Sequence, residues 1–446
     1  MGKPTGFLDY TRVNCPSRDA AARTGDYAPV ELPLSERNRR RQSGRCMDCG
    51  VPFCQAGASF EGVLLGCPLH NLIPEWNDLL WNGNYEGALQ RLLKTSPFPE
   101  FTGRVCPALC ERACVCGQVS EPVTIRENEL SIIEYGFEND LMQPMPSAAR
   151  SDKKIAVIGS GPAGLSAAYY LNRRGHHVTV FEKDPLPGGL LTYGIPEMKL
   201  PKQIVARRVS LMEREGVSFR TSCRVGQQIS PEELAAQFDL VIFCCGAQQP
   251  RPLPCAEQAP QGVYYALDYL RASAEGLLSA EAPKISAAGK HVVVIGAGDS
   301  ASDCVAVALR QGCASLTQLI RKPRSEKTEK LDPAHEEALA VLGGEIRRYE
   351  TQAERLIAGE DGALQGVRLL GSEETLPCEL LLIASGFSGC QTQALQACEA
   401  VRQTGVHVLQ AGDMASGASL VVLAIASGKQ AAARADELLM GYTNIL

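Results

Sequence analysis

The chain has 446 residues, of which 45% are hydrophobic and 21% charged, and this composition describes a folded globular protein rather than a disordered or fibrous one. Its length allows about three domains of ordinary size. The net charge of −6 gives no general reason to expect a nucleic-acid partner, and no apolar run approaches the roughly 20 residues of a membrane span.

Half of the 18 cysteines lie between Cys15 and Cys116. The N-terminus lacks the apolar core of a secretion signal, so we expect a cytoplasmic protein whose cysteines bind metal instead of forming disulfides. Two patterns, C-x2-C-x4-C followed by a lone Cys-Pro and C-x3-C-x3-C, comprise Cys46, Cys49, Cys54, Cys67, Cys106, Cys110 and Cys114. Close cysteine pairs present several thiolates to one cluster, which favours iron–sulfur over the alternative of tetrahedral zinc.

Helices are predicted near residues 69–80 and 85–94, and a linker at 142–150, where two prolines and small residues occur. Beyond the linker the pattern becomes that of strand–helix–strand units. Buried strands are predicted at 154–158, 178–181, 239–243, 291–295, 316–320, 380–383 and 406–409, and a last helix at about 419–439.

The first glycine motif, GSGPAG, follows a predicted strand and opens a helix, and it consists of Gly159, Gly161, Pro162, Ala163 and Gly164 with Ser160. In this context the first glycine permits a tight turn, the second lets the backbone approach a pyrophosphate, and the third allows helix–strand packing. The helix N-terminus favours the anion. Glu182, at the end of the next strand, is a candidate acceptor for ribose hydroxyls.

The second motif, GAGDSA, consists of Gly296, Gly298, Asp299, Ser300 and Ala301 with Ala297. Its second strand ends in Arg321-Lys322, followed by Arg324 and Lys327, instead of an acid. A guanidinium can bind a 2′-phosphate, so we predict NADPH over NADH; the alternative is a solvated basic loop.

Thiolate clusters carry single electrons and nicotinamides carry hydrides, so one chain with both needs a converter, usually a flavin. Gly412-Asp413, before the last helix, completes the motifs of a two-dinucleotide flavoprotein. We predict an α/β flavoprotein with two Rossmann-like dinucleotide-binding domains and an N-terminal α-helical iron–sulfur domain. The expected segments are the cluster domain at 1–145, the FAD domain at 151–287 and 386–446, and the NADPH domain at 288–385.

Several segments resemble the small (beta) subunit of NADPH-dependent glutamate synthase and its wider family, which shares a flavin and iron–sulfur module with dihydropyrimidine dehydrogenase. They are CMDCGVPFC (46–54), GCPLHNLIPEWNDL (66–79), FPEFTGRVCPALCERAC (98–114), VIGSGPAGLSAAYYL (157–171), GGLLTYGIPEMKLPK (188–202) and AGDMASGASLVVLAIASGKQAA (411–432). The resemblance implies FAD, NADPH and two 4Fe-4S clusters, and it places Gly189 and Leu190 at the flavin.

By the same resemblance, one cluster is held by Cys46, Cys49, Cys54 and Cys114. The other is held by Cys67, Cys106 and Cys110, with an oxygen donor that best matches Glu129. Cys116 is the rival for this last position.

The resemblance implies an electron-input subunit that oxidises NADPH and passes electrons to the glutamate synthase large subunit, which makes glutamate from 2-oxoglutarate and glutamine. No catalytic side chain is assigned, because hydride transfer needs alignment rather than a proton-transfer group. Two alternatives stay open: an NAD(P)H:ferredoxin-type oxidoreductase with another acceptor, which a shortened segment between Lys322 and Leu369 favours, and a zinc-stabilised flavin-binding scaffold.

Overall fold

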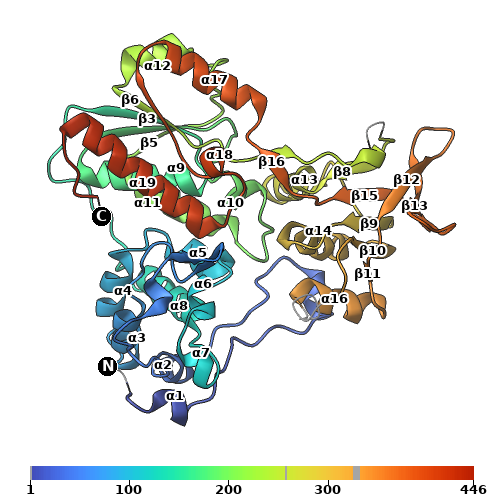
Figure 1. Ribbon diagram of the computed structural model, residues 1–446, viewed down its shortest axis with the longest axis horizontal. Coiled ribbons are helices and arrows are strands. Elements are labelled where there is room, and N and C mark those ends of the chain that lie inside the picture. The colour runs from blue at the N-terminus through green and yellow to red at the C-terminus, as the bar shows by residue number, and fades with distance from the viewer. Residues whose placement is uncertain (1–2, 257–258, 325–331, 446) are drawn as a thin grey trace.

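Three units make up the protein in the computed structural model, which describes residues 3–256, 259–324 and 332–445 (Figure 1). An N-terminal helical unit lies under a first α/β unit, and a second α/β unit lies to one side of both. Within the described residues, every helix is too short or too polar to span a bilayer.

The N-terminal unit packs its longer helices around large buried side chains, among them Trp76, Phe98, Phe101 and Ile132. The predicted helices near 69–80 and 85–94 are confirmed, although the first begins only at Ile73, because Pro74 suits the first turn of a helix. The elements of the unit are α1 (Gly6–Asp9), η1 (Ala22–Gly25), α2 (Glu36–Ser43), η2 (Phe53–Gln55), β1 (Ala58–Phe60), β2 (Val63–Leu65), α3 (Ile73–Trp81), α4 (Tyr85–Leu93), α5 (Pro99–Val105), α6 (Leu109–Arg112), α7 (Cys116–Val119) and α8 (Ile125–Glu138).

The first α/β unit contains a parallel sheet with the strand order β17-β6-β3-β4-β5. Alternate residues of the central strand β3 enter different cores: Ile155 and Val157 pack with α9 and α19, whereas Ala156 and Ile158 pack in the core that contains Leu234 of α12. Both faces are therefore covered, as a parallel sheet requires. The elements are β3 (Lys154–Ile158), α9 (Pro162–Arg174), β4 (His177–Phe181), α10 (Leu190–Tyr193), α11 (Lys202–Arg214), β5 (Ser218–Arg220), α12 (Pro231–Gln237), β6 (Leu240–Phe243), α17 (Thr392–Gln403), β17 (His407–Gln410), α18 (Asp413–Ser416) and α19 (Val421–Met440).

The second α/β unit has a parallel sheet with the order β11-β10-β9-β15-β8 and an antiparallel sheet with the order β12-β13-β14. Val292 and Val294 of β9 face the helices, and Val293 faces the antiparallel sheet. The elements are η3 (Pro254–Ala256), β8 (Val263–Tyr265), α13 (Ala266–Ser279), β9 (His291–Ile295), α14 (Asp299–Arg310), β10 (Ser315–Ile320), α16 (Pro333–Leu342), β11 (Arg347–Tyr349), β12 (Ala353–Ala358), β13 (Leu364–Leu369), β14 (Thr375–Pro377) and β15 (Leu380–Ile383).

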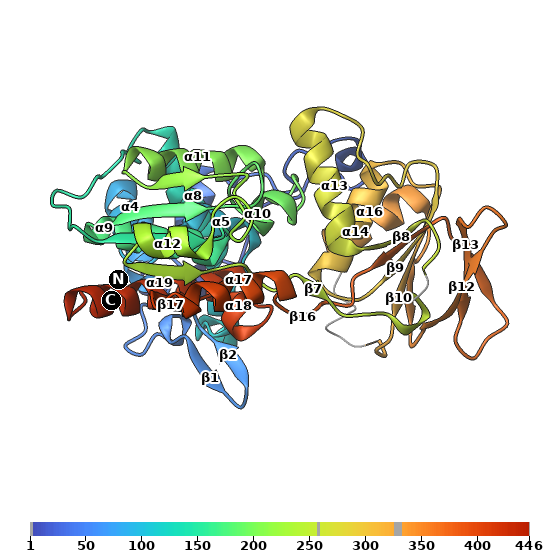
Figure 2. The same cartoon turned by 90° about the horizontal axis from the view of Figure 1, so that it is seen from above.

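The two α/β units are joined by a ribbon of two antiparallel strands, β7 (Gln249–Pro250) and β16 (Phe387–Gly389) (Figure 2). The predicted start of the second unit at residue 288 is wrong. Strand β8 pairs with β15, and α13 packs on α14, so residues 263–279 belong to the second unit. The error has a physical origin, since β8 is a three-residue edge strand without a glycine motif after it.

A segment of the N-terminal unit, residues 15–34, extends to the second α/β unit, and we call it the strap (Figure 1). Arg23 of the strap is 1% exposed, and its Nε lies 2.6 Å from Oε1 of Glu337, a residue of α16 that is equally buried. Arg310 of α14 binds the other oxygen of Glu337 at 2.7 Å. The strap therefore ties the second unit to the N-terminal unit through a buried charge network.

Candidate functional site

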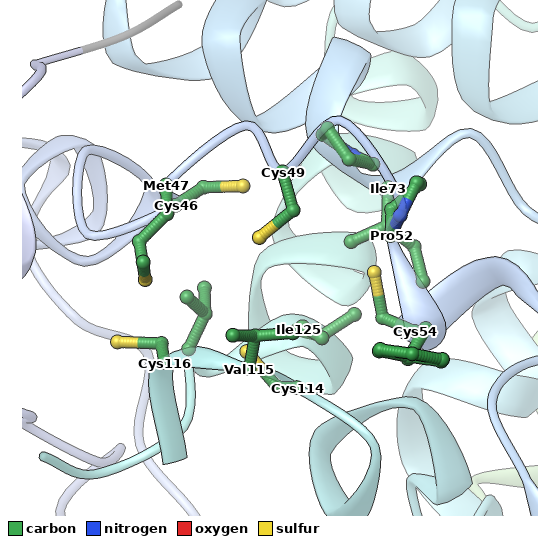
Figure 3. A pocket seen from close by; sticks show the side chains of 13 residues that line it. Cys46, Met47, Cys49, Pro52, Cys54, Ile73, Cys114, Val115, Cys116 and Ile125 are labelled. Atoms are coloured by element: carbon green, nitrogen blue, oxygen red, sulfur yellow. The ribbon is translucent and has the colours of Figure 1, made fainter. Parts of the chain in front are cut away.

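The first pocket of the N-terminal unit is lined by five cysteine side chains, of which Cys116 directs its sulfur away from the other four (Figure 3). They are Cys46, Cys49, Cys54, Cys114 and Cys116. Among the described residues, no trio of His, Cys, Asp or Glu side chains is placed to hold a single metal ion, and the thiols are instead spread around the pocket. Four of these five are the residues that the resemblance gives to one cluster.

The second pocket is lined by Cys67, Cys106, Cys110 and Glu129. Glu129 comes from α8 and is 7% exposed; its Oε1 accepts hydrogen bonds from Thr102 at 2.7 Å and from Ser96 at 3.4 Å. The structure thus brings Glu129 to the three cysteines of the second set. Cys116, its rival, lines the other pocket, where its Sγ lies 3.3 Å from the carbonyl oxygen of Glu121.

The two pockets are neighbours, because Ile73 and Ile125 line both of them. Val422, from the first turn of α19, also lines the second pocket. The second pocket therefore faces the first α/β unit, and the first pocket lies beyond it.

Burial raises the pKa of the pocket thiols, to about 12 for Cys46 and Cys67 and to about 11 for Cys106. Burial also raises the pKa of Glu129, to about 7, although hydrogen bonds from Thr102 and Ser96 oppose the shift. Desolvation accounts for these shifts because it penalises each group's charged form. Such groups are poor anions by themselves and become good ligands when a cationic metal centre supplies the compensating charge.

The first glycine turn lies between β3 and α9, and its middle glycine borders open space. A Cβ atom added at Gly159, where φ is +101°, would lie 2.5 Å from the carbonyl oxygen of Cys244, and one at Gly164 would lie 1.9 Å from the carbonyl oxygen of Gly159. At Gly161 an added Cβ would meet no atom within 4 Å. The outer glycines are therefore required by the fold, and the space before Gly161 suits a pyrophosphate.

Other expected FAD residues meet at this turn. Glu182 is 4% exposed and accepts hydrogen bonds from the amide of Ser160 at 3.0 Å and from its hydroxyl at 2.5 Å. The same hydroxyl accepts from the amide of Gly188 at 2.9 Å, and a Cβ at Gly189 would lie 3.0 Å from Cα of Gly161. Ser160, for which the motif predicts no separate role, therefore connects the glycine turn to Glu182 and to the loop that precedes Leu190.

Gly412 and Asp413 reach the same region from the C-terminal segment. Gly412 has a φ of +66°, and a Cβ added there would lie 2.6 Å from that of Ala163. Oδ1 of Asp413 accepts a hydrogen bond from Ser419 at 2.5 Å, and burial raises the pKa of Asp413. Gly428 of α19 was also missed: an added Cβ would lie 2.1 Å from the carbonyl oxygen of Ala163, so α19 packs directly on α9.

The second glycine turn has the same design in the second α/β unit. Gly296 has a φ of +141°, and an added Cβ would lie 2.6 Å from the carbonyl oxygen of Ala384, whereas Gly298 faces open space. The residues from Ala297 to Ser300 are exposed at the N-terminus of α14, and Ala301 is buried behind them. Here too the turn can receive a pyrophosphate at a helix N-terminus.

The basic residues lie next to this second turn. Arg321 and Lys322 are exposed and directly follow β10, and the amide of Gly296 donates to the carbonyl oxygen of Leu319 on that strand at 3.1 Å. Arg324 is exposed as well, and Lys327 lies outside the described residues. A cation at the end of this strand is in place for the ribose of a dinucleotide bound at the turn.

Two family models match the chain. Residues 153–428 match the pyridine nucleotide-disulphide oxidoreductase family, and residues 23–141 match dihydropyrimidine dehydrogenase domain II, 4Fe-4S cluster. The glutamate synthase (NADPH) small chain of Bacillus subtilis is 42% identical over 99% of this chain and 99% of its own. The chain belongs to the glutamate synthase small-chain family.

Some relatives of this chain are much longer than it is. Glutamate synthase (NADH) of Schizosaccharomyces pombe is 36% identical over 99% of this chain, which corresponds to 23% of the yeast protein. A solved structure of 2-naphthoyl-CoA reductase is 18% identical, with a TM-score of 0.51, and covers 80% of this chain and 52% of that one; the two share a fold.

The matches confirm the resemblance, the fold class and the expected cofactors: FAD, a pyridine nucleotide and 4Fe-4S clusters. The 4Fe-4S description decides against the zinc-stabilised scaffold.

Proposed function

We propose that this chain oxidises NADPH in the cytoplasm and delivers the electrons, one at a time, to the large chain of glutamate synthase. The proposal rests on the arrangement of two adjoining cysteine pockets, the second of which is also lined by Val422 from the first α/β unit. When bound, FAD accepts a hydride from NADPH and the 4Fe-4S clusters carry single electrons.

The residues of the first α/β unit position the flavin cofactor in this proposal. The amide of Gly161 and the N-terminus of α9 receive the pyrophosphate, assisted by Pro162 and Ala163, which form the first helical turn. Glu182 accepts from the adenosine ribose. Gly189 and Gly412 lie against Gly161 and Ala163 of the same turn, so that they and their neighbours Leu190 and Asp413 would contact the flavin.

We propose that the second α/β unit binds NADPH in preference to NADH. Gly298 and the N-terminus of α14, with Asp299 and Ser300, receive the pyrophosphate. Arg321 and Lys322 bind the 2′-phosphate, because exposed cations at this strand end attract a group that an acid would repel.

Each cysteine pocket holds one 4Fe-4S cluster in this proposal. Cys46, Cys49, Cys54 and Cys114 are the ligands in the first pocket, and Cys67, Cys106, Cys110 and Glu129 are those in the second. The buried position of Glu129, with Thr102 and Ser96 directed at its carboxylate, supports a ligand role over that of a surface acid.

The relatives support the choice of partner, since the bacterial relative is a glutamate synthase small chain and the yeast relative is a glutamate synthase. The test is anaerobic reconstitution of the holo chain with the purified large chain. We expect NADPH-dependent formation of glutamate from 2-oxoglutarate and glutamine only when both chains are present. If the holo chain reduces ferredoxin rapidly, and if no glutamate is formed when the large chain is added, the ferredoxin-type alternative is supported instead.

A further inference from the structure

A loop of the first α/β unit, residues 184–202, contacts the second α/β unit, and we call it the bridging loop. It contains Gly189 and Leu190, and the amide of its Gly188 donates to the hydroxyl of Ser160 in the first glycine turn at 2.9 Å. Helix α10, which is part of this loop, lies next to α13 of the second unit (Figure 2). The bridging loop therefore touches both the first glycine turn and the unit that carries the second one.

The first contact across the two units is made by Arg271 of α13. Its guanidinium binds both carboxylate oxygens of Asp184, with Nη2 2.6 Å from Oδ2 and Nη1 3.1 Å from Oδ1. The same guanidinium lies over the ring of Tyr193, with its Cζ 4.5 Å from the ring centre. A bidentate pair fixes direction as well as distance, so Arg271 holds α13 in one orientation against the bridging loop.

The second contact is made at α14, the helix that begins at the second glycine turn. Lys199 forms an ion pair with Asp303, which is 8% exposed and lies one helical turn beyond Asp299. Desolvation lowers the pKa of Lys199, but the charges of Asp303, Asp299 and Asp332 outweigh this effect and raise the pKa above its usual value. A cation of the first unit thus lies among acids of the second unit, at the N-terminal half of α14.

The bridging loop is itself held in shape by buried groups. Met198 is 3% exposed and packs in the helical core of the second unit. The ammonium of Lys202, a residue that is 8% exposed, donates to three carbonyl oxygens of the loop. They belong to Leu191 at 3.1 Å, Ile195 at 2.5 Å and Leu200 at 3.1 Å. Because its backbone is fixed from within, the loop can hold the second unit at a set place relative to the first glycine turn.

We propose that Lys199 and Arg271 are positioning residues for hydride transfer, because their ion pairs set the place of the second α/β unit relative to the flavin. The proposal rests on the proposed function, in which NADPH in the second unit reduces FAD in the first. In that step a hydride, with both its electrons, passes from NADPH to FAD and leaves NADP⁺ and reduced flavin.

The two ion pairs are better suited to positioning than to stabilising the fold. The side chains of Lys199 and Arg271 are 39% and 28% exposed, and ion pairs of this kind add little to stability. Helix α14 begins at the turn that would receive the pyrophosphate of NADPH, so a shift of α14 moves the nicotinamide relative to the flavin. A displacement of about 1 Å at the reacting atoms can cost about 100-fold in rate. The strap acts elsewhere, since it holds α16 through Glu337.

The test measures reduction of the flavin in the anaerobic holo chain by stopped-flow absorbance, over a range of NADPH concentrations. Lys199→Met and Arg271→Met each remove one charge, whereas Lys199→Arg keeps it. Arg174→Met is the matched control, because Nε of Arg174 lies 2.9 Å from Oδ2 of the buried Asp436 within the first α/β unit. The control removes a cation from a buried carboxylate and leaves the contacts between the two units intact. Reduction of the flavin by dithionite, FAD content and melting temperature are measured for every variant.

We expect the limiting rate of flavin reduction to fall about tenfold or more in Lys199→Met and in Arg271→Met. The half-saturating NADPH concentration should change by less than about threefold, because neither side chain binds the nucleotide. Lys199→Arg and the Arg174→Met control should keep the limiting rate within about threefold of the wild type. Asp303→Asn added to Lys199→Met should lower the rate no further, since the two residues act as one pair. Dithionite should reduce the flavin equally in all variants.

Wild-type limiting rates in both charge-removing variants overturn the positioning role. A higher half-saturating NADPH concentration with an unchanged limiting rate also overturns it, because Lys199 or Arg271 would then bind the nucleotide itself. An equal loss of rate in Arg174→Met attributes the effect to general instability and refutes the proposal in the same way. If NADPH reduces the wild-type flavin but no glutamate forms with the large chain, only the choice of partner fails. A wild-type chain whose flavin NADPH does not reduce contradicts the proposed function, and the positioning role with it.

Discussion

The equivalent glycines Gly161 and Gly298 allow the two dinucleotide sites to be separated by single substitutions. Gly161 has φ −64° and ψ −179°, and Gly298 has φ −94° and ψ −179°, which are conformations that any residue adopts. A Cβ at either position meets no protein atom within 4 Å. Alanine therefore fits the fold at both sites and intrudes only on the space that a bound pyrophosphate would need.

The expected loss of affinity for the dinucleotide follows from this difference between protein contacts and pyrophosphate contacts. Alanine at a helix N-cap costs about 1 kcal/mol relative to a better cap, and no clash adds to it. A displaced pyrophosphate loses a hydrogen bond between an amide and a charged group, which is worth about 1.5–3 kcal/mol. That corresponds to a loss of about 10- to 150-fold in affinity. Gly164→Ala is the contrasting variant, since its Cβ would lie 1.9 Å from the carbonyl oxygen of Gly159 and must disturb the fold.

The assay compares retained flavin absorbance, the KM for NADPH and the melting temperature of each variant. We expect Gly161→Ala to lose FAD on dilution and Gly298→Ala to keep FAD but to raise the KM for NADPH by about 10- to 150-fold. Both should melt close to the wild type, and Gly164→Ala well below it. If Gly298→Ala lowers FAD retention as much as Gly161→Ala does, or leaves the KM for NADPH unchanged, the two-site reasoning is wrong.

Three further substitutions test the remaining parts of the site. Arg321→Glu should raise the KM for NADPH far more than the KM for NADH, because an acid repels the 2′-phosphate; equal effects in a two-substrate kinetic comparison would refute the assignment. Glu129→Ala should lower iron from about eight to about four per chain, since Glu129 lines only the second pocket; full iron in an anaerobic assay would return Cys116 to consideration. Arg23→Met removes one member of a buried charge network, a change that typically costs about 3–5 kcal/mol, so subtilisin should cut the strap faster than in the wild type. Arg18→Met, whose partner Asp26 is exposed, is the control for the strap, and equal cleavage of the two variants would argue against a tether at Arg23.

Much of the fold could be predicted because the strands that carry the glycine motifs are short, apolar after their first residue, and followed by a turn that only glycine allows. Strand β3 before Gly159 and β9 before Gly296 are of this kind. The strands of the antiparallel sheet β12-β13-β14 were not predicted. Arg355 and Arg368 interrupt their apolar pattern, and what decides their position is burial against Val293 and Leu381 of another sheet.

The grouping of the cysteines was available only through the resemblance. The spacing shows that Cys106, Cys110 and Cys114 are neighbours in sequence, yet Cys114 lines one pocket and the other two line the next. Cys110 lies within the short helix α6, which follows Ala108 with its φ of +55°, whereas Cys114 lies beyond the end of that helix. Alanine gives no local signal for a left-handed conformation, and the spacing does not show where α6 begins or ends, so spacing alone could not separate the two sets.

The strap and the ribbon together bear on how hydride transfer is arranged. The ribbon β7-β16 is a two-stranded connection that would by itself let the second α/β unit turn relative to the first. The strap adds a second, distant attachment, because Arg23 and Arg310 share Glu337 in a site closed to solvent. Two separated attachments restrict rotation far more than one does. Since hydride transfer depends on alignment of the nicotinamide with the flavin, the N-terminal unit contributes to that alignment as well as providing the cysteine pockets.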